Sequence, residues 1–91
     1  MRELRWAAEA LDDLDRIAVF NEQRSFEWAL RVQHAITRQA ERLVEAPLRA
    51  PRQPGSQDRT VLISDFQYVL TYAVDSAFVV VKSIRHTWED R

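Results

Sequence analysis

The chain has 91 residues, a formal net charge of −1 and no cysteine. We expect residues 1–91 to form one domain, because chains divide into several cores only beyond about 250 residues. The lack of cysteine excludes a disulfide scaffold, a zinc–thiolate site and a cysteine nucleophile. An apolar fraction of 46% argues against disorder. No apolar run approaches the roughly 18 residues of a membrane span, and the first five residues lack a signal-peptide pattern, which together predict a soluble cytoplasmic protein.

Charge is unevenly distributed along the chain. Residues 1–27 carry four arginines and seven acids, whereas residues 31–59 carry six arginines and three acids. Twelve of the thirteen basic residues are arginine, which forms two-pronged bonds with phosphates and carboxylates. The second segment therefore predicts either a surface for RNA or an acidic partner, or the commoner solvated helix face.

The first half of the chain predicts a strand and two helices. Leu4–Trp6 alternates apolar and charged residues, as in a short edge strand. A first helix follows as far as Asn21, which breaks its pattern, and Ser25 is a typical cap for a second helix of about twenty residues that ends before Pro47. The short break between them predicts an antiparallel hairpin. The apolar positions of the first helix are Ala10, Leu11, Leu14, Ile17 and Ala18.

The second half predicts three strands. Residues 47–58 hold all three prolines and the single glycine, which is typical of a loop. Strands are predicted at 61–63, 68–74 and 78–84, and the short turns between them indicate an antiparallel meander. The fold class is therefore α+β: an N-terminal edge strand and an antiparallel two-helix hairpin packed on a three- to four-stranded antiparallel sheet, in the order β-α-α-β-β-β.

Strict alternation predicts apolar residues on both faces of this sheet. One face would carry Tyr68, Leu70, Tyr72, Val74, Phe78, Val80 and Ile84. The other would carry Val69, Thr71, Ala73, Val79 and Val81. Two helices cover only one face, so the second predicts either a shallow apolar cleft or a surface covered by a partner chain.

Several short motifs resemble the ParE branch of the RelE/ParE toxin superfamily over nearly the whole chain. They are Leu4-Arg5-Trp6, the stretch Ala10 to Ile17, Arg59, Tyr68 to Val74, and Ile84-Arg85-His86 before Trp88. The resemblance implies a RelE/ParE-like toxin of a type II toxin–antitoxin system. Such a toxin poisons DNA gyrase, is neutralised by direct binding of a ParD-like antitoxin, meets DNA only through that antitoxin, and contacts no membrane.

Binding residues follow from this resemblance and from the sequence pattern. Arg85, His86 and Trp88 are the candidates for target binding, and the indole of Trp88 in a polar tail is typical of a binding anchor. The candidates for antitoxin binding lie beside the helix hairpin and on the second sheet face. They are Leu11, Leu14, Val69, Thr71, Val79 and Val81.

A RelE-type, ribosome-dependent endoribonuclease is the alternative, and it would be metal-independent. Cleavage requires a base, cations on the phosphate and an acid. Arg59 and Arg85 are candidate clamps and His86 a candidate acid, but the sequence offers no evident base, which favours a non-enzymatic inhibitor. Simple pairing also explains these arginines: Arg59 with Asp58 or Asp65, and Arg85 with Glu89 or Asp90.

A third alternative is a weakened, non-toxic relative. Thr60 stands where the family usually has an acid, Ala73 stands where it often has arginine, and the isoelectric point is near 6.1 in a superfamily that is usually basic. No cofactor or metal is predicted. His34 and His86 are too isolated to form a metal signature, and a chain with one glycine has no glycine-rich phosphate loop.

Overall fold

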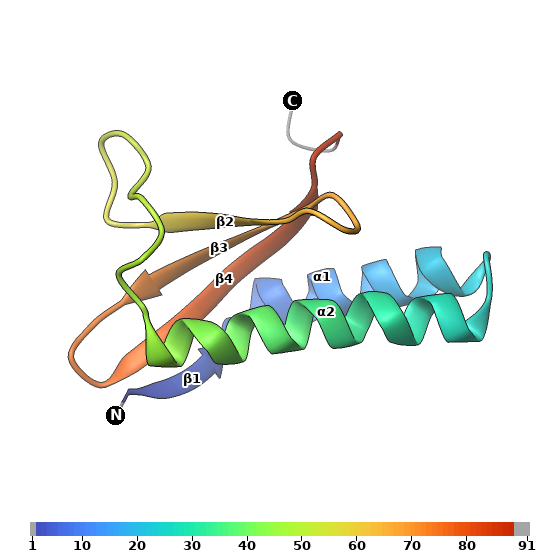
Figure 1. Cartoon of the computed structure of the whole chain (residues 1–91), viewed down its shortest axis with the longest axis horizontal. Helices are drawn as coiled ribbons and strands as arrows, with labels where there is room; N and C mark the ends of the chain where they lie inside the picture. Colours follow the sequence, from blue (N-terminus) through green and yellow to red (C-terminus); the bar gives the residue numbers. More distant parts are fainter. Residues whose placement is uncertain (1, 89–91) are drawn as a thin grey trace.

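A computed structural model describes residues 2–88 of the chain. It has the predicted element order and confirms the α+β class (Figure 1). The elements are β1 (Glu3–Trp6), α1 (Ala8–Glu22), α2 (Phe26–Glu45), β2 (Arg59–Ile63), β3 (Tyr68–Val74) and β4 (Phe78–His86).

The four strands form one sheet in the order β1-β4-β3-β2. β2, β3 and β4 make the predicted antiparallel meander, and β1 is an edge strand as predicted. However, β1 runs parallel to β4, with Leu4 opposite Val79 and Trp6 opposite Val81. The sheet is therefore mixed rather than wholly antiparallel. A short turn forces neighbouring strands to be antiparallel, but the helices and two further strands separate β1 from β4 and leave their relative direction free.

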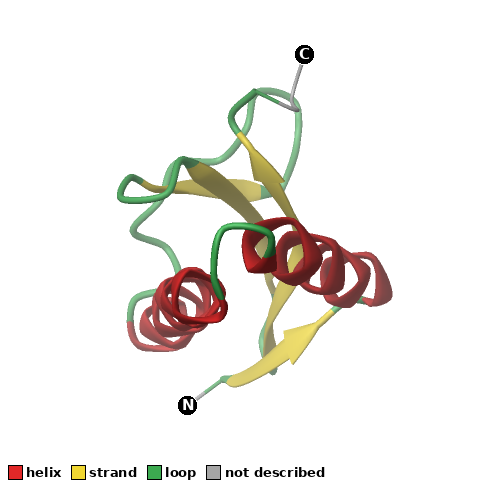
Figure 2. Cartoon of the chain, turned by 90° about the vertical axis from the view of Figure 1, so that its right-hand side faces the viewer, coloured by secondary structure: helices red, strands yellow, loops and turns green. Residues whose placement is uncertain are grey.

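The helices form an antiparallel hairpin beside the sheet (Figure 2). Their apolar sides and those of the strands make one core. The Ser25 hydroxyl caps α2 by accepting a hydrogen bond from the backbone N–H of Trp28 at 2.9 Å, as predicted. Buried residues at helical spacing then line α2 to its end before Pro47. None of the helices in residues 2–88 is both long and apolar enough to span a membrane.

A bulge in β4 decides which side chains face the core. Tyr72 pairs with Val81 but Thr71 pairs with Ser83, so Lys82 is an additional residue in β4. The extra residue reverses the alternation: Val81 faces the core before it and Ile84 faces the core after it, and both are fully buried.

The predicted face for Val79 and Val81 is therefore wrong, because it assumed strict alternation through position 82. Both valines are fully buried. The outer face of the sheet carries instead the half-buried side chains of Val69, Thr71, Ala73 and Val80.

Candidate functional site

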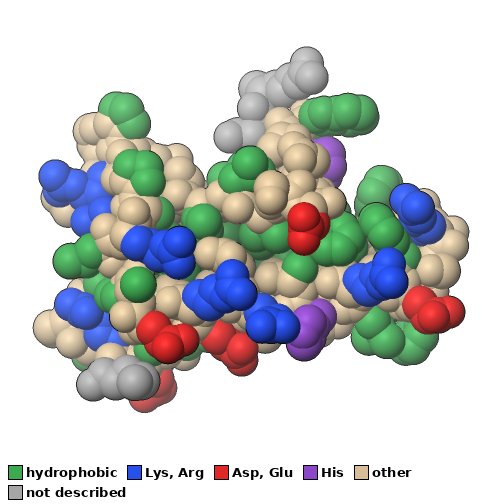
Figure 3. All heavy atoms as spheres, viewed as in Figure 1, with side chains coloured by type: hydrophobic (Ala, Val, Ile, Leu, Met, Phe, Trp, Pro, Cys, Tyr) green, Lys and Arg blue, Asp and Glu red, His purple; other side chains and the backbone are tan. Residues whose placement is uncertain are grey.

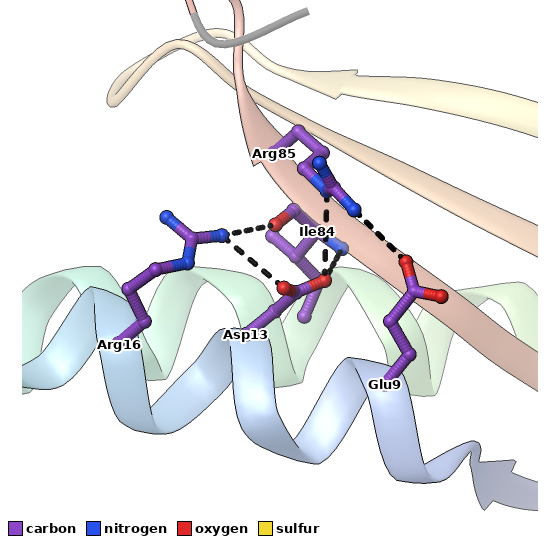
Figure 4. Close-up of polar contacts among 5 residues, drawn as sticks. All are labelled: Glu9, Asp13, Arg16, Ile84 and Arg85. Atoms are coloured by element: carbon purple, nitrogen blue, oxygen red, sulfur yellow. Dashed lines mark hydrogen bonds and ion pairs between the residues drawn. The ribbon is translucent and has the colours of Figure 1, made fainter.

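The edge of β4 is sealed by α1 where β1 ends. β1 pairs with β4 only as far as Val81. Beyond it, the Asp13 carboxylate accepts a hydrogen bond from the backbone N–H of Ile84 at 2.9 Å, and Arg16 donates to the Ile84 carbonyl at 3.4 Å (Figure 4). Side chains of α1 thus replace a strand at this edge, and the Asp13 side chain is only 8% exposed.

Arg85 belongs to the same polar cluster. Its guanidinium lies 3.0 Å from the carboxylate of Glu9 and 4.0 Å from that of Asp13, which also pairs with Arg16 at 3.2 Å (Figure 4). Two acids of α1 therefore hold Arg85 at the end of β4. The partners predicted for it, at positions 89 and 90, lie outside the described residues.

Beside this cluster, four rings form what we call the aromatic cradle: Phe20, Tyr68, His86 and Trp88. The His86 ring stands edge-on to Tyr68, at 5.2 Å between ring centres, and to Trp88, at 5.6 Å. The backbone N–H of Trp88 donates to Nδ1 of His86 at 3.2 Å. The rings line a hollow of about 600 Å³ together with Arg16, Ile17 and Gln67. Trp88 is 76% and Phe20 64% exposed, so the cradle opens to solvent.

The buried side chain of Asn21 supports the cradle by hydrogen bonding to the Tyr68 hydroxyl. Its amide nitrogen donates to the Tyr68 hydroxyl at 3.1 Å and to the Ile17 carbonyl at 2.8 Å, and its amide oxygen accepts from the Trp28 indole at 3.0 Å. The predicted break at Asn21 is wrong, because α1 continues to Glu22. The buried amide joins α1, α2 and β3, which holds the Tyr68 ring in place.

The three residues predicted to bind a target share one end of β4 but not one surface. His86 and Trp88 belong to the cradle. Arg85 projects from the other face of β4, where it also lines a hollow with Val69 and Thr71. This separation follows from the alternation of neighbouring side chains along a strand.

The ribonuclease candidates are not gathered in one place. Arg59 lies opposite Tyr72, whereas His86 lies opposite Tyr68, which separates them by about 13 Å along β3 at 3.3 Å per residue. Arg59 donates to the Ala50 carbonyl at 2.5 Å and so anchors the loop before β2.

Neither carboxylate predicted to pair with Arg59, that of Asp58 or that of Asp65, forms an ion pair with it. Asp58 pairs with Lys82 at 3.2 Å. Among residues 2–88, no carboxylate lies within ion-pair distance of Arg59, including that of Asp65.

The residues predicted to bind an antitoxin fall into two groups. Leu11 is exposed on α1, Leu14 packs partly against the core, and Val69 and Thr71 line the outer sheet face. Val79 and Val81 are fully buried and present no surface to a partner in this structure. Residues 2–88 contain no cluster of three or more side chains suited to a metal ion.

Sequence reasoning missed the roles of Asp13, Phe20 and Asn21. The available signal for Asp13 was its place between Ala10 and Ile17, which puts it on the core side of the helix. The same signal was available for Asn21, four residues after Ile17. Phe20 lies at the margin of the apolar face, and only the packed structure shows that it lines a hollow with Tyr68 and His86.

Comparison with known proteins gives a consistent result. A family model described as the ParE toxin of type II toxin–antitoxin system, parDE, matches residues 4–91. A solved structure of the chromosomal ParDE TA system from P. aeruginosa matches with a TM-score of 0.84 and 24% identity, over 94% of this chain and 96% of that one.

Two structures of YafQ from E. coli, one of them a histidine-to-glutamine variant, are more distant. Their TM-scores are 0.64 and 0.65, with 9% and 11% identity over 98% of this chain and 97% of theirs. These structural likenesses show the fold. No curated protein matches.

Proposed function

The chain belongs to the ParE toxin family of type II toxin–antitoxin systems, and we propose that it inhibits growth by binding DNA gyrase through the aromatic cradle until an antitoxin neutralises it. This proposal rests on the solvent exposure of two rings in the cradle. Trp88 and Phe20 are large rings held mostly in solvent, and Arg16 lines the same hollow. Aromatic and arginine side chains of this kind contribute most of the binding energy in protein interfaces.

The arrangement of the polar residues favours binding over RNA cleavage. A ribonuclease must bring an acid, a base and cations to one phosphate group. In this chain Arg59 and His86 are far apart along β3, and Arg85 faces away from His86 and is held by acids of α1. The proposed toxin is therefore a protein-binding inhibitor.

We propose that a ParD-like antitoxin covers α1 and the outer sheet face. Leu11 is half-exposed on α1 next to the partly buried Leu14. Val69 and Thr71 line a shallow hollow of about 460 Å³ on the outer sheet face. An extended segment of a partner, crossing both areas, would remove these apolar groups from water.

A supercoiling assay with purified gyrase tests the target. We expect the folded chain to reduce supercoiling and to accumulate cleaved DNA, and the Trp88→Ala variant to lose at least about tenfold in potency, as expected for an interface anchor. Leu48→Ala is the matched control, because Leu48 is a large exposed side chain outside the cradle.

The proposal fails if the folded chain leaves supercoiling unchanged at high concentration. New messenger cleavage in a translating extract would support the ribonuclease instead. Equal potency of the Trp88→Ala and Leu48→Ala variants would show that gyrase binds elsewhere. Adding the antitoxin should restore supercoiling and protect Leu11 and Thr71 amides from hydrogen exchange.

A further inference from the structure

A second groove lies on the other side of the molecule from the polar cluster of α1, between α2 and the end of β2. We call it the arginine groove. One wall carries Arg31, His34, Arg38 and Arg42 of α2, and the other is formed by residues 62–66. Its volume is about 530 Å³. Figure 3 shows a row of basic side chains and a histidine across this face, over α2.

The three arginines of this groove direct their charge to solvent. Among residues 2–88, none of them has a carboxylate within ion-pair distance, although Glu27 and Glu41 stand at helical spacing from Arg31 and Arg38. Arg38 and Arg42 are one turn apart, or about 6 Å along the axis, and Arg31 is about 10 Å further back. The result is a row of cations along one wall.

The opposite wall belongs to the free edge of the sheet. β2 is the last strand of the sheet, and in the described part of the chain only Arg59 has a bridge on its outer side, to Arg52. The following residues, 60–63, are uncharged and contain no proline. Charge, proline and bulges are the usual protections of an edge strand, so this edge is available for another strand.

The groove also has apolar surface. Leu62 is 51% exposed, and the half-buried Phe66 and Ala35 lie in the walls. A ligand that fits must therefore combine backbone hydrogen bonds, negative charge and some apolar side chains.

We propose that the arginine groove binds an extended acidic segment of a partner protein. The segment adds a strand to the outer edge of β2 and sets its carboxylates against Arg31, Arg38 and Arg42. Alternate residues of a strand are about 6.6 Å apart, which matches the axial spacing of Arg38 and Arg42. Arginine binds carboxylates through two parallel hydrogen bonds, and strand addition supplies the backbone pairing.

Two other occupants fit less well. A second copy of this chain, pairing edge to edge along β2, would bring two arginine rows close to each other, and like charges repel. A nucleic acid would meet the exposed Leu62 in the wall and would gain nothing from the free backbone edge. The proposal is independent of gyrase inhibition, because the groove shares no residue with the aromatic cradle.

The test uses the full chain labelled with nitrogen-15 and an uncharged-end peptide of about ten residues that alternates glutamate and valine, as strand addition requires. We expect saturable shifts of the backbone amides at 60–66 and 31–42. The Arg38→Glu/Arg42→Glu variant should weaken binding at least about tenfold, which corresponds to 1.4 kcal/mol. About 1 M NaCl, where the screening length is about 3 Å, should also weaken it.

Controls separate the groove from general charge attraction. Arg49→Glu reverses one charge at an exposed position outside the groove and should leave binding unchanged, whereas the single reversal Arg42→Glu should weaken it. A peptide with glutamine in place of glutamate should bind much more weakly. Arg38→Gln/Arg42→Gln, which removes charge without reversing it, should lie between the wild type and the reversed variant, and each variant's spectrum reports whether it is folded.

Four results would overturn the proposal. They are the absence of shifts in the groove, equal binding of the glutamine peptide, tighter binding of a single-stranded oligonucleotide than of the acidic peptide, and shifts of residues 60–63 that depend on protein concentration alone. The third result would assign the groove to nucleic acid, and the fourth to a second copy of the chain.

Discussion

Replacing Asp13 with alanine removes the carboxylate that seals the edge of β4. This carboxylate accepts the Ile84 backbone N–H at 2.9 Å and pairs with Arg16 and Arg85 (Figure 4). Alanine leaves the N–H of Ile84 in a largely buried position without an acceptor, and it removes one ion pair each from Arg16 and Arg85, which keep their contacts with the Ile84 carbonyl and with Glu9.

The hydrogen bond dominates the expected loss of stability. A hydrogen bond to a charged acceptor contributes about 1.5–3 kcal/mol. Arg16 and Arg85 are about half exposed, at 45% and 47%, so water screens them and each pair adds at most about 0.5 kcal/mol. We expect a total loss of about 1.5–4 kcal/mol. A domain of this length has about 5–14 kcal/mol in all, and its Tm should fall by roughly 6–32 °C.

Urea and thermal unfolding, followed by circular dichroism, measure this loss. Asp12→Ala is the matched control, because Asp12 is an exposed neighbour on the same helix and should change stability by no more than about 0.5 kcal/mol. Asp13→Asn keeps an acceptor for Ile84 and should lose clearly less than Asp13→Ala. If Asp13→Ala and Asp12→Ala are equally stable, the carboxylate does not hold the edge of β4, and the account of this site is wrong.

Three further perturbations test other parts of the structure. Burial raises the pKa of Tyr72, so its contribution to stability is present below about pH 10 and is lost as pH rises through the raised value. Tyr72→Phe removes the hydrogen bond to Pro47 and should lower the free energy of unfolding by about 1 kcal/mol at pH 7. If urea titrations show the wild type and the variant losing stability in parallel at high pH, the role of Tyr72 is wrong. Hydrogen bonds from two backbone N–H groups of the following turn lower the pKa of Asp75. Its contribution to stability is therefore present above its unfolded pKa near 4 and is lost as pH falls through the lowered value. Asp75→Asn should make Tm fall less steeply as pH decreases, and an unchanged dependence of Tm on acid pH would refute the assignment. Asn21→Ala should cost about 1–3 kcal/mol by leaving buried polar groups unpaired and should increase the mobility of the Tyr68 ring, which aromatic NMR relaxation reports; unchanged relaxation would show that Asn21 does not hold the cradle.

Local signals in the sequence predicted most of the fold. The Ser25 cap and the proline at 47 bound a helix of 20 residues, Phe26–Glu45, and the β-branched and aromatic run Tyr68–Val74 is a strand with those limits. These features depend on neighbouring residues alone. The direction of β1 and the bulge at Lys82 depend on how distant strands pack, which local patterns do not encode.

The candidate site was predicted only in part for the same reason. The exposed ring of Trp88 follows from a tryptophan in a polar segment, and the structure places it on His86. The support of the cradle by Asn21 and the sealing of β4 by Asp13 join elements 47 and 71 residues apart in the chain. A polar residue on the core side of a helix was the available signal, and only the packed structure shows which group it meets.

The backbone groups at the edge of β4 and at the edge of β2 differ in availability, and the two proposals assign a different partner to each. At β4, Asp13 and Arg16 occupy the backbone groups that another strand would use, so a partner there meets side chains, and the exposed rings of the cradle are the available contacts. At β2, the backbone edge remains open beside arginines without carboxylate partners among residues 2–88. A partner there gains backbone hydrogen bonds and charge pairing together. If both proposals hold, one chain binds a target and a second protein at the same time. Sedimentation of the three together should then detect a ternary complex, and its absence would show that the two surfaces are not independent.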